Sequence, residues 1–280
     1  MSDPVAVTRG GHRTFLKWHR ARRRATDSAF IGRRILEGMV LGASVEVDLV
    51  RHRDHGMAVL HDHRSIARET TGSGPSASHS AAELRALHLR GNDGRPIDDH
   101  VMLLEDLCNL LARRPPHHDA RLQLDYKEGQ GALDEASVAG FARSVGPVAQ
   151  SMILSSGEAS SVRALADATA GLHVGFDPCH DEAEAQLRAS GDFAGFVETA
   201  LAQSPKAEMI YLAFPLLLAA NDAGFDIVGA FHQAGRRVDA YTLKTADPAD
   251  VAIAQRLLAS RVDQITTDDP EGLAAQLEGS

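Results

Sequence analysis

The chain has 280 residues, of which 44% are hydrophobic and 24% charged, a balance typical of a folded globular protein. It has no run of about 18 apolar residues, and its N-terminal segment is polar and charged, so we expect a cytoplasmic protein without a signal peptide or stable membrane insertion. Cys108 and Cys179 lie far apart, which disfavours a disulfide scaffold or a zinc knuckle and favours two core thiols. The length fits two ordinary domains or one α/β barrel.

The net charge of -9 is unevenly distributed. Residues 1–37 carry nine basic and three acidic side chains, a local balance of +6 that leaves -15 for the remainder. This segment is either a solvated helix face or a positive rim that attracts an anionic substrate. No aromatic interleaving or nucleic-acid module accompanies it, so we expect no nucleic-acid partner.

Short apolar or β-branched runs alternate with helix-like stretches along the chain. The predicted strands, in order, are Thr14–Trp18, Ser44–Leu49, Arg121–Asp125, Ser151–Ser155, Leu172–Asp177, Glu208–Ala213, Val238–Thr242 and Gln264–Thr267. The predicted helices between them include Asp98–Arg113, Ser160–Ala170, Asp181–Gln203, Asn221–Ala234 and Asp247–Ser260. Eight strands that alternate with helices predict parallel pairing and closure into a (β/α)8 TIM barrel.

One region interrupts this alternation. A hairpin signal at Asp54-His55-Gly56 and the polar stretch Thr70–Arg95 predict a small inserted excursion after the second strand, spanning about residues 52–97. No long linker and no internal repeat divides the chain, so we expect a single domain over residues 1–280.

The second predicted strand carries two carboxylates, Glu46 and Asp48, on the same face. Side by side in a barrel mouth they would repel each other unless a cation lay between them, and oxygen-only ligation suits Mg2+, Ca2+ or Mn2+. The alternative is an ordinary half-exposed strand. The hairpin that follows returns His61 toward the pair, where it could exchange a proton with a phosphoryl oxygen.

Two further strands end in polar pairs. His19-Arg20 follows the first strand, where Arg20 could bind a phosphate and His19 act as acid or base, although the pair also begins the basic run up to Arg24. Asp125 and Lys127 lie on one face of the third strand, as an additional metal ligand and a phosphate contact or as a surface ion pair.

The order of these motifs resembles the glycerophosphodiester phosphodiesterase family over nearly the whole chain, from about Phe15 to Leu273. The matching segments are His19-Arg20, Gly42 to Asp48, Val59 to Asp62, Arg68 to Gly74, Ser80 to Leu84, Leu124 to Lys127, Val238 to Thr242 and Ile265 to Pro270. Several spaced motifs in the same order are more specific than any one of them.

The resemblance implies a phosphoric diester hydrolase that splits glycerophosphodiesters or a related small-molecule phosphodiester into an alcohol and a phosphomonoester. It implies one divalent cation held by Glu46, Asp48 and Asp125, with His19 and His61 as general acid and base. By the same resemblance Arg20 and Lys127 hold the phosphate. Tyr241 is either a wall of the alcohol pocket or a buried barrel tyrosine.

Several positions depart from the family pattern. Ala21 replaces the usual glycine, the segment 25–28 differs, Asp125 is shorter than the usual glutamate, and the segments 155–157 and 241–244 are altered. Since these changes affect the substrate pocket more than the metal and histidine positions, two alternatives stay open. One is phospholipase D-like cleavage of a lysophospholipid that releases a cyclic phosphate, and the other is a non-catalytic barrel that binds a phosphate ligand. The oligomeric state is not indicated.

Overall fold

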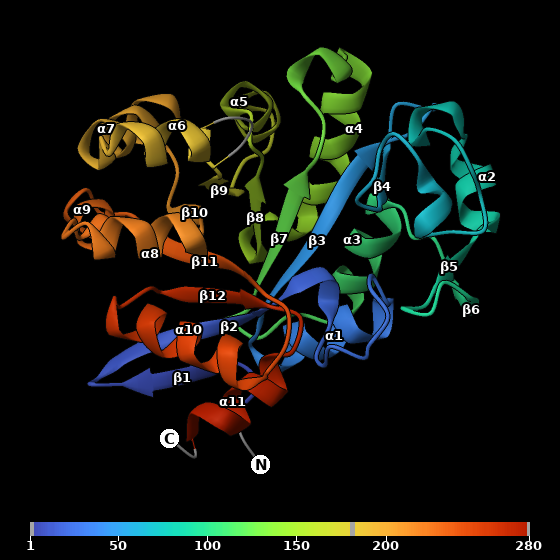
Figure 1. The fold of residues 1–280 in the computed structure, drawn as a ribbon. Coiled ribbons are helices and arrows are strands. Elements are labelled where there is room, and N and C mark those ends of the chain that lie inside the picture. The colour runs from blue at the N-terminus through green and yellow to red at the C-terminus, as the bar shows by residue number, and fades with distance from the viewer. Residues whose placement is uncertain (1–2, 180–182, 279–280) are drawn as a thin grey trace.

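The structure, a computed structural model, describes residues 3–179 and 183–278 (Figure 1). Eight parallel strands form a closed barrel, and Trp18 of β2 pairs with Val45 of β3 to close it. The barrel strands are β2 (His12–Trp18), β3 (Ser44–Arg51), β7 (Arg121–Tyr126), β8 (Met152–Ser155), β9 (His173–Phe176), β10 (Met209–Ala213), β11 (Arg237–Leu243) and β12 (Gln264–Thr267). The predicted TIM barrel is confirmed, and each of the eight predicted strands overlaps one of these.

Helices surround the barrel (Figure 1). They are α1 (Gly32–Leu41), α3 (Leu104–Arg113), α4 (Glu135–Val145), α5 (Ala159–Asp167), α6 (Ala183–Ser190), α7 (Phe193–Gln203), α8 (Phe214–Asp222), α9 (Ile227–Gln233), α10 (Pro248–Ala259) and α11 (Pro270–Glu278). Close contact between layers explains one glycine of α1. A Cβ at Gly38 would lie 2.6 Å from Val45 of β3, so only glycine lets the helix approach the strand this closely.

Three predicted helices have different bounds. The helix predicted from Asp98 begins at Leu104, because residues 96–100 form a strand instead. The helix predicted over Asp181–Gln203 is two helices, since Gly191 has a φ of 68° and Asp192 then caps α7; residues 181 and 182 lie outside the described part. The helix predicted over Asn221–Ala234 is likewise broken, between α8 and α9, where Gly224 has a φ of 81°.

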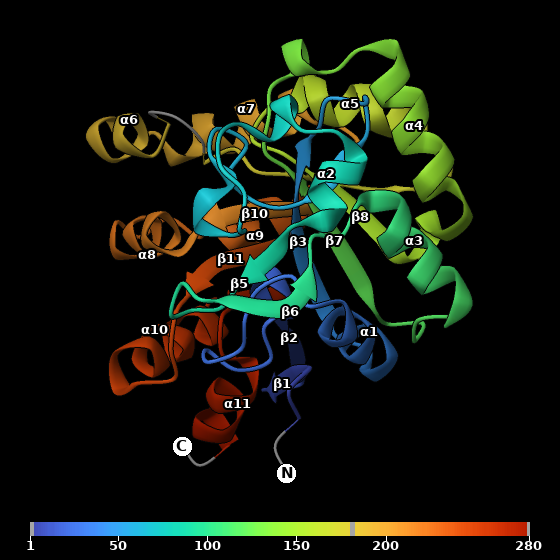
Figure 2. The ribbon, with the colours of Figure 1, turned by 90° about the vertical axis from the view of Figure 1, so that its right-hand side faces the viewer.

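The predicted insertion follows β3. The hairpin leads into β4 (Met57–Val59), which pairs antiparallel with β3, and the chain continues through α2 (Ala81–Ala86) to the antiparallel pair β5 (His88–Arg90) and β6 (Pro96–His100). Figure 2 shows these elements in front of the barrel strands. The tip of the β5–β6 pair is tied to the loop after β2, because Asn92 Nδ2 donates to the carbonyls of Ala25 and Asp27 at 3.1 and 3.2 Å.

Additional features lie outside the barrel ring. A short strand, β1 (Ala6–Arg9), pairs antiparallel with β2 and was not predicted. Cys108 is buried on α3, as expected of a core thiol, whereas Cys179 is only partly buried after β9.

In the described part of the chain no single helix is long and apolar enough to cross a membrane. The helices α8 and α9 reach that length and composition only together, across a bend of 101°.

Candidate active site

Three carboxylates meet where β3 and β7 run side by side. Glu46 and Asp48 lie on the same face of β3, and Asp48 is in register with Asp125 on β7. One oxygen from each of the three carboxylates lies within 4.8 Å of the other two. Glu46 and Asp48 are only 3% and 1% exposed. The geometry therefore brings together the three acidic residues that the sequence pattern singled out.

Two cationic residues compensate for part of this negative charge. Lys127 Nζ lies 2.9 Å from Asp48 Oδ1 and also forms an ion pair with Asp125. The backbone amide of Arg20 donates to Glu46 Oε2 at 2.7 Å, and Arg20 Nε lies 3.2 Å from Asp48 Oδ2. Arg20 and Lys127 thus contact the acidic cluster from two different strand ends.

The pKa values of the two buried carboxylates move in opposite directions. Burial and the charge of Asp48 raise the pKa of Glu46 well above its usual value. Burial also acts to raise the pKa of Asp48, but the charges of Lys127 and Arg20 outweigh it and lower that pKa. Asp48 is therefore anionic, and Glu46 is the group that would gain most from an added cation.

The backbone that presents Arg20 is strained. Arg20 and Ala21 have φ values of 52° and 59°, and the Arg20 carbonyl accepts from the Phe30 amide at 2.9 Å. The family resemblance expects glycine at position 21, which adopts this conformation freely. Ala21 adopts it at a cost of roughly 1 kcal/mol, a strain that the surrounding fold must offset.

His19 is held by a carboxylate from the far end of the chain. Its Nδ1 lies 2.6 Å from Oδ1 of Asp268, which directly follows β12, and Arg22 Nη1 donates to the same oxygen at 3.0 Å. Burial lowers the pKa of His19 to about 4, although Asp268 acts in the opposite direction. The imidazole is therefore neutral near pH 7. Because its Nδ1–H donates to Asp268, Nε2 keeps a free lone pair.

His61 enters the site from the loop after β4. The Glu69 carboxylate accepts the backbone amides of His61 and Asp62, each at 3.0 Å from Oε2, and so fixes this loop. Burial lowers the pKa of His61, while the charge of Asp48 partly opposes the shift. Both predicted histidines thus lie at the mouth of the barrel, and the pKa of each is lowered.

These residues surround a cavity of about 250 Å3 at the carboxyl ends of the strands. Its lining includes both histidines, Arg20, Lys127, Glu46, Asp125 and Tyr241. The Tyr241 hydroxyl donates to Asp177 at 2.9 and 3.0 Å, so this tyrosine faces the cavity with its polar end fixed. Burial raises the pKa of Asp177 to about 6.

The donor set fits a hard divalent cation. All three candidate ligands offer carboxylate oxygens, which Mg2+, Ca2+ and Mn2+ prefer. Within the described residues, Asp48 Oδ2 is buried and makes no hydrogen bond; it has an ion pair with Arg20 Nε at 3.2 Å, so this oxygen still has room for a cation.

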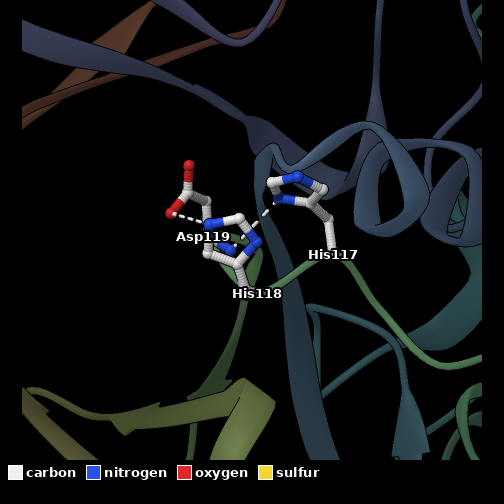
Figure 3. A group of neighbouring side chains, drawn as sticks. All are labelled: His117, His118 and Asp119. Atoms are coloured by element: carbon white, nitrogen blue, oxygen red, sulfur yellow. Dashed lines mark hydrogen bonds and ion pairs between the residues drawn. The ribbon is translucent and has the colours of Figure 1, made fainter.

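A second group of metal-ligand types lies at the opposite end of the barrel, before β7: His117, His118 and Asp119 (Figure 3). His117 Nδ1 already accepts the Asp119 amide at 3.2 Å, and the His118 side chain is 82% exposed. We assign no role to this group.

The sequence analysis did not identify several polar residues that hold the site residues in place at the mouth of the barrel. Asp177 and Asp268 contact Tyr241 and His19, and Ser155 Oγ donates to Asp125 Oδ1 at 2.8 Å. A signal was present, because Asp177 and Asp268 each directly follow a barrel strand, where side chains reach the catalytic face.

Comparisons with known proteins agree with this geometry. A model of the glycerophosphoryl diester phosphodiesterase family matches residues 37–272. A comparison with curated proteins found no match. Similar solved structures include a putative glycerophosphodiester phosphodiesterase from Galdieria sulphuraria, with a TM-score of 0.73, 17% identity, and coverage of 95% of this chain and 98% of that one.

Two bacterial structures are also similar. A putative glycerophosphoryl diester phosphodiesterase from Agrobacterium tumefaciens has a TM-score of 0.68, 22% identity and coverage of 95% and 98% of the two chains. A phosphodiesterase from Oleispira antarctica, in complex with the product sn-glycerol-3-phosphate, has a TM-score of 0.64, 17% identity and coverage of 94% and 96%. The structures share the fold, and the family model, which spans most of the chain, shows that this protein belongs to the glycerophosphoryl diester phosphodiesterase family.

Proposed function

We propose that this protein is a metal-dependent phosphodiesterase that hydrolyses glycerophosphodiesters to an alcohol and a phosphomonoester. One observation carries the proposal: both histidines, Arg20, Lys127, Glu46 and Asp125 line one small cavity at the mouth of the barrel, and Asp48 lies in the same acidic cluster. The product named in the Oleispira antarctica structure, sn-glycerol-3-phosphate, is a phosphomonoester of the expected class.

In this proposal the two histidines exchange protons on opposite sides of phosphorus. His19 is the base, because its Nε2 lone pair is free while Asp268 accepts from Nδ1. It takes the proton of the attacking hydroxyl, which belongs to water or to a neighbouring hydroxyl of the glycerol arm. His61 gives a proton to the alcohol oxygen as the P–O bond breaks. Attack by the neighbouring hydroxyl would first form a cyclic phosphate, which water then opens.

Glu46, Asp48 and Asp125 would hold one divalent cation, Mg2+, Ca2+ or Mn2+, next to the phosphate. When bound, such an ion neutralises phosphate charge and polarises the phosphoryl group. Arg20 and Lys127 contribute further positive charge to the same phosphate. Tyr241, which lines the 250 Å3 cavity, forms a wall of the alcohol pocket on the side of the glycerol arm.

Activity measurements on purified protein test the proposal. We expect release of glycerol phosphate from a glycerophosphodiester in the presence of a divalent ion, loss of activity with chelator, and at least about a hundredfold loss in His19→Ala and in His61→Ala, the range typical of acid–base groups. His118→Ala is the matched control, since this exposed histidine lies at the opposite end of the barrel.

Full activity in either His19→Ala or His61→Ala would overturn the assignment of these histidines as general acid and base. Phosphorus NMR of the products separates hydrolysis from cleavage that stops at a cyclic phosphate. Tight substrate binding without turnover under saturating Mg2+, Ca2+ and Mn2+ would instead indicate a non-catalytic binding barrel.

We also propose that residues 1–280 act as a single domain, with the insertion over about residues 52–97, and that the protein works in the cytoplasm on a small-molecule phosphodiester.

A further inference from the structure

A second cavity, of about 720 Å3, lies between the barrel mouth and the insertion. Segments from the loop after β2, the loop after β4 and the β5–β6 pair line it, and Figure 2 shows the insertion on this side of the barrel. It shares Arg20 and His61 with the 250 Å3 cavity. Because His61 stands where the two cavities meet, an alcohol that leaves toward His61 extends into the larger one.

Four arginines line this second cavity, and two of them are neutralised by carboxylates. Arg20 Nε lies 3.2 Å from Asp48, and Arg22 Nη1 lies 3.0 Å from Asp268. The positive charges of these two arginines are therefore already paired with carboxylates at the mouth of the barrel.

The other two, Arg68 and Arg90, have no ion pair with any carboxylate among the residues that the structure describes. The Arg90 guanidinium is anchored by backbone carbonyls, because Nε donates to Thr70 O and Nη1 to Gly94 O, both at 2.7 Å. In the described part of the chain, no carboxylate therefore balances the positive charge of Arg90, and the two hydrogen bonds fix the orientation of its guanidinium. Arg68 is exposed on the neighbouring segment of the insertion, where the Glu69 carbonyl accepts the Arg90 amide at 2.8 Å.

Two carboxylates also line the cavity, but both are engaged by the backbone. Asp62 Oδ1 accepts the amides of Arg64 and Ser65 at 2.9 and 3.1 Å, and Glu69 accepts the amides of His61 and Asp62. They hold the loop that carries His61. The large apolar side chains of the lining, Phe30 and Leu89, are 3% and 2% exposed, so they offer little surface to an acyl chain.

We propose that the larger cavity receives the leaving alcohol and selects alcohols that carry their own anionic group, a carboxylate or a phosphomonoester, which pairs with Arg68 and Arg90. The inference rests on the proposed phosphodiesterase function and names its substrate class. A guanidinium held in place by its own hydrogen bonds loses little conformational freedom when it binds such a group.

A matched pair of substrates tests this preference. Glycerophosphoserine and glycerophosphoethanolamine differ only in one carboxylate on the leaving alcohol. We expect kcat/KM to be about tenfold or more higher for the serine compound, the factor typical of one charge-assisted hydrogen bond. Arg68→Gln and Arg90→Gln should each lower the ratio of the two kcat/KM values, and the double variant should bring it close to one.

Arg95→Gln is the control, because Arg95 lies on the same β5–β6 turn, is 86% exposed and does not line the cavity. It should leave both rates unchanged, and melting temperatures verify that every variant is folded. Equal rates on the two substrates, or a ratio that both arginine substitutions leave unchanged, would overturn the inference while the phosphodiesterase function stands. Failure to hydrolyse either compound with any of the three metals would overturn both.

Discussion

In His19, burial sets the charge of a candidate base, and its contact with Asp268 sets the tautomer. Burial alone favours a neutral imidazole, while the Asp268 carboxylate 2.6 Å away fixes which nitrogen carries the proton. Asp268 itself stays anionic: burial opposes ionisation, but the hydrogen bond and charge of His19 lower its pKa to about 2. The neutral form of His19 is therefore available over most of the acidic range.

This arrangement predicts the pH dependence of the reaction. Since the pKa of His19 is lowered to about 4, its base form is lost only as the pH falls through that value, and the acid limb of kcat/KM should lie well below the 6.5 of an ordinary imidazole. Asp268→Asn removes the charge that supports protonation, so the limb should move lower still. The rate should fall by roughly tenfold or more, because the ring is less firmly oriented.

The measurement is a kcat/KM profile between pH 3.5 and 8. Glu208→Gln is the matched control, because Glu208 lies 2.9 Å from the Nδ1 of His173 in a similar pair outside both cavities. An acid limb that stays near pH 6.5 in the parent protein would contradict the neutral state of His19.

The sequence predicted which residues form the site better than it predicted which residues they contact. Glu46 and Asp48 are two positions apart on one strand, so strand periodicity alone puts them on one face. The contact of His19 with Asp268 depends on β12 lying next to β2 with Thr267 opposite Trp18, and no local pattern encodes that register. Long-range pairs of this kind follow only once the barrel closes.

At the scale of elements, four strands share one buried polar network, three of whose side chains also line the 250 Å3 cavity. Lys17 of β2 is 2% exposed; its Nζ donates to Gln123 of β7 and lies 3.1 Å from Asp239 of β11. Gln264 and Thr266 of β12 donate to the Asp239 oxygens at 2.6 and 2.7 Å. The network satisfies every charge that it buries, so it joins these strands at a defined register.

Lys17→Met should therefore be strongly destabilising. It leaves Asp239 buried without its cation, and breaking a buried pair in this way typically costs about 3 to 5 kcal/mol of unfolding free energy. Urea denaturation measures the loss. Adding Asp239→Asn should recover much of it, because the uncompensated charge is then removed.

A surface pair offers the control for this experiment. Lys206 Nζ lies 2.7 Å from Asp167, but its side chain is 72% exposed, so Lys206→Met should change the unfolding free energy by less than about 1 kcal/mol. Equal losses in Lys17→Met and Lys206→Met would show that the buried network does not stabilise the barrel.

Sequence periodicity located the strands more reliably than the helix ends. The run Met209–Ala213 is buried throughout, so its apolar pattern marks it clearly. The break before α7 depends on one glycine with a positive φ and one capping aspartate, signals too local for periodicity to detect. The strand β6 was missed because its sequence, Pro-Ile-Asp-Asp-His, also fits a helix start.

Across the whole molecule, the basic N-terminal segment is largely neutralised within the fold. Arg23 pairs with Glu37 and with Glu271 of α11, and Arg34 pairs with Asp27 and Glu37. Arg23 thereby joins the first helix to the last, while the Arg34 pairs stay within the segment. Three basic residues of the segment line one or both cavities: Lys17, Arg20 and Arg22.

The acidic cluster predicts that divalent ions stabilise the folded protein. An ion that binds only the folded state adds about 2.7 kcal/mol at a concentration 100 times its dissociation constant. For a chain of this size that corresponds to a rise in melting temperature of roughly 5 to 10 °C. Thermal unfolding with and without Mg2+, Ca2+ or Mn2+ measures it, independently of catalysis.

Two substitutions show which group binds the ion. Asp125→Asn should remove most of the rise, whereas Asp119→Asn, in the exposed group at the other end of the barrel, should leave it intact. A rise that survives Asp125→Asn and disappears in Asp119→Asn would transfer the metal site to the opposite end.

The order of strands in the barrel also determines when the site can form during synthesis. The segment with His19 leaves the ribosome well before its partner Asp268, which is 249 positions later in the chain. A chain that ends before β12 has neither a closed barrel nor the Asp268 carboxylate that orients His19. The proposed base is therefore oriented only after Asp268 has been synthesised, so a chain that is cut short before β12 lacks it.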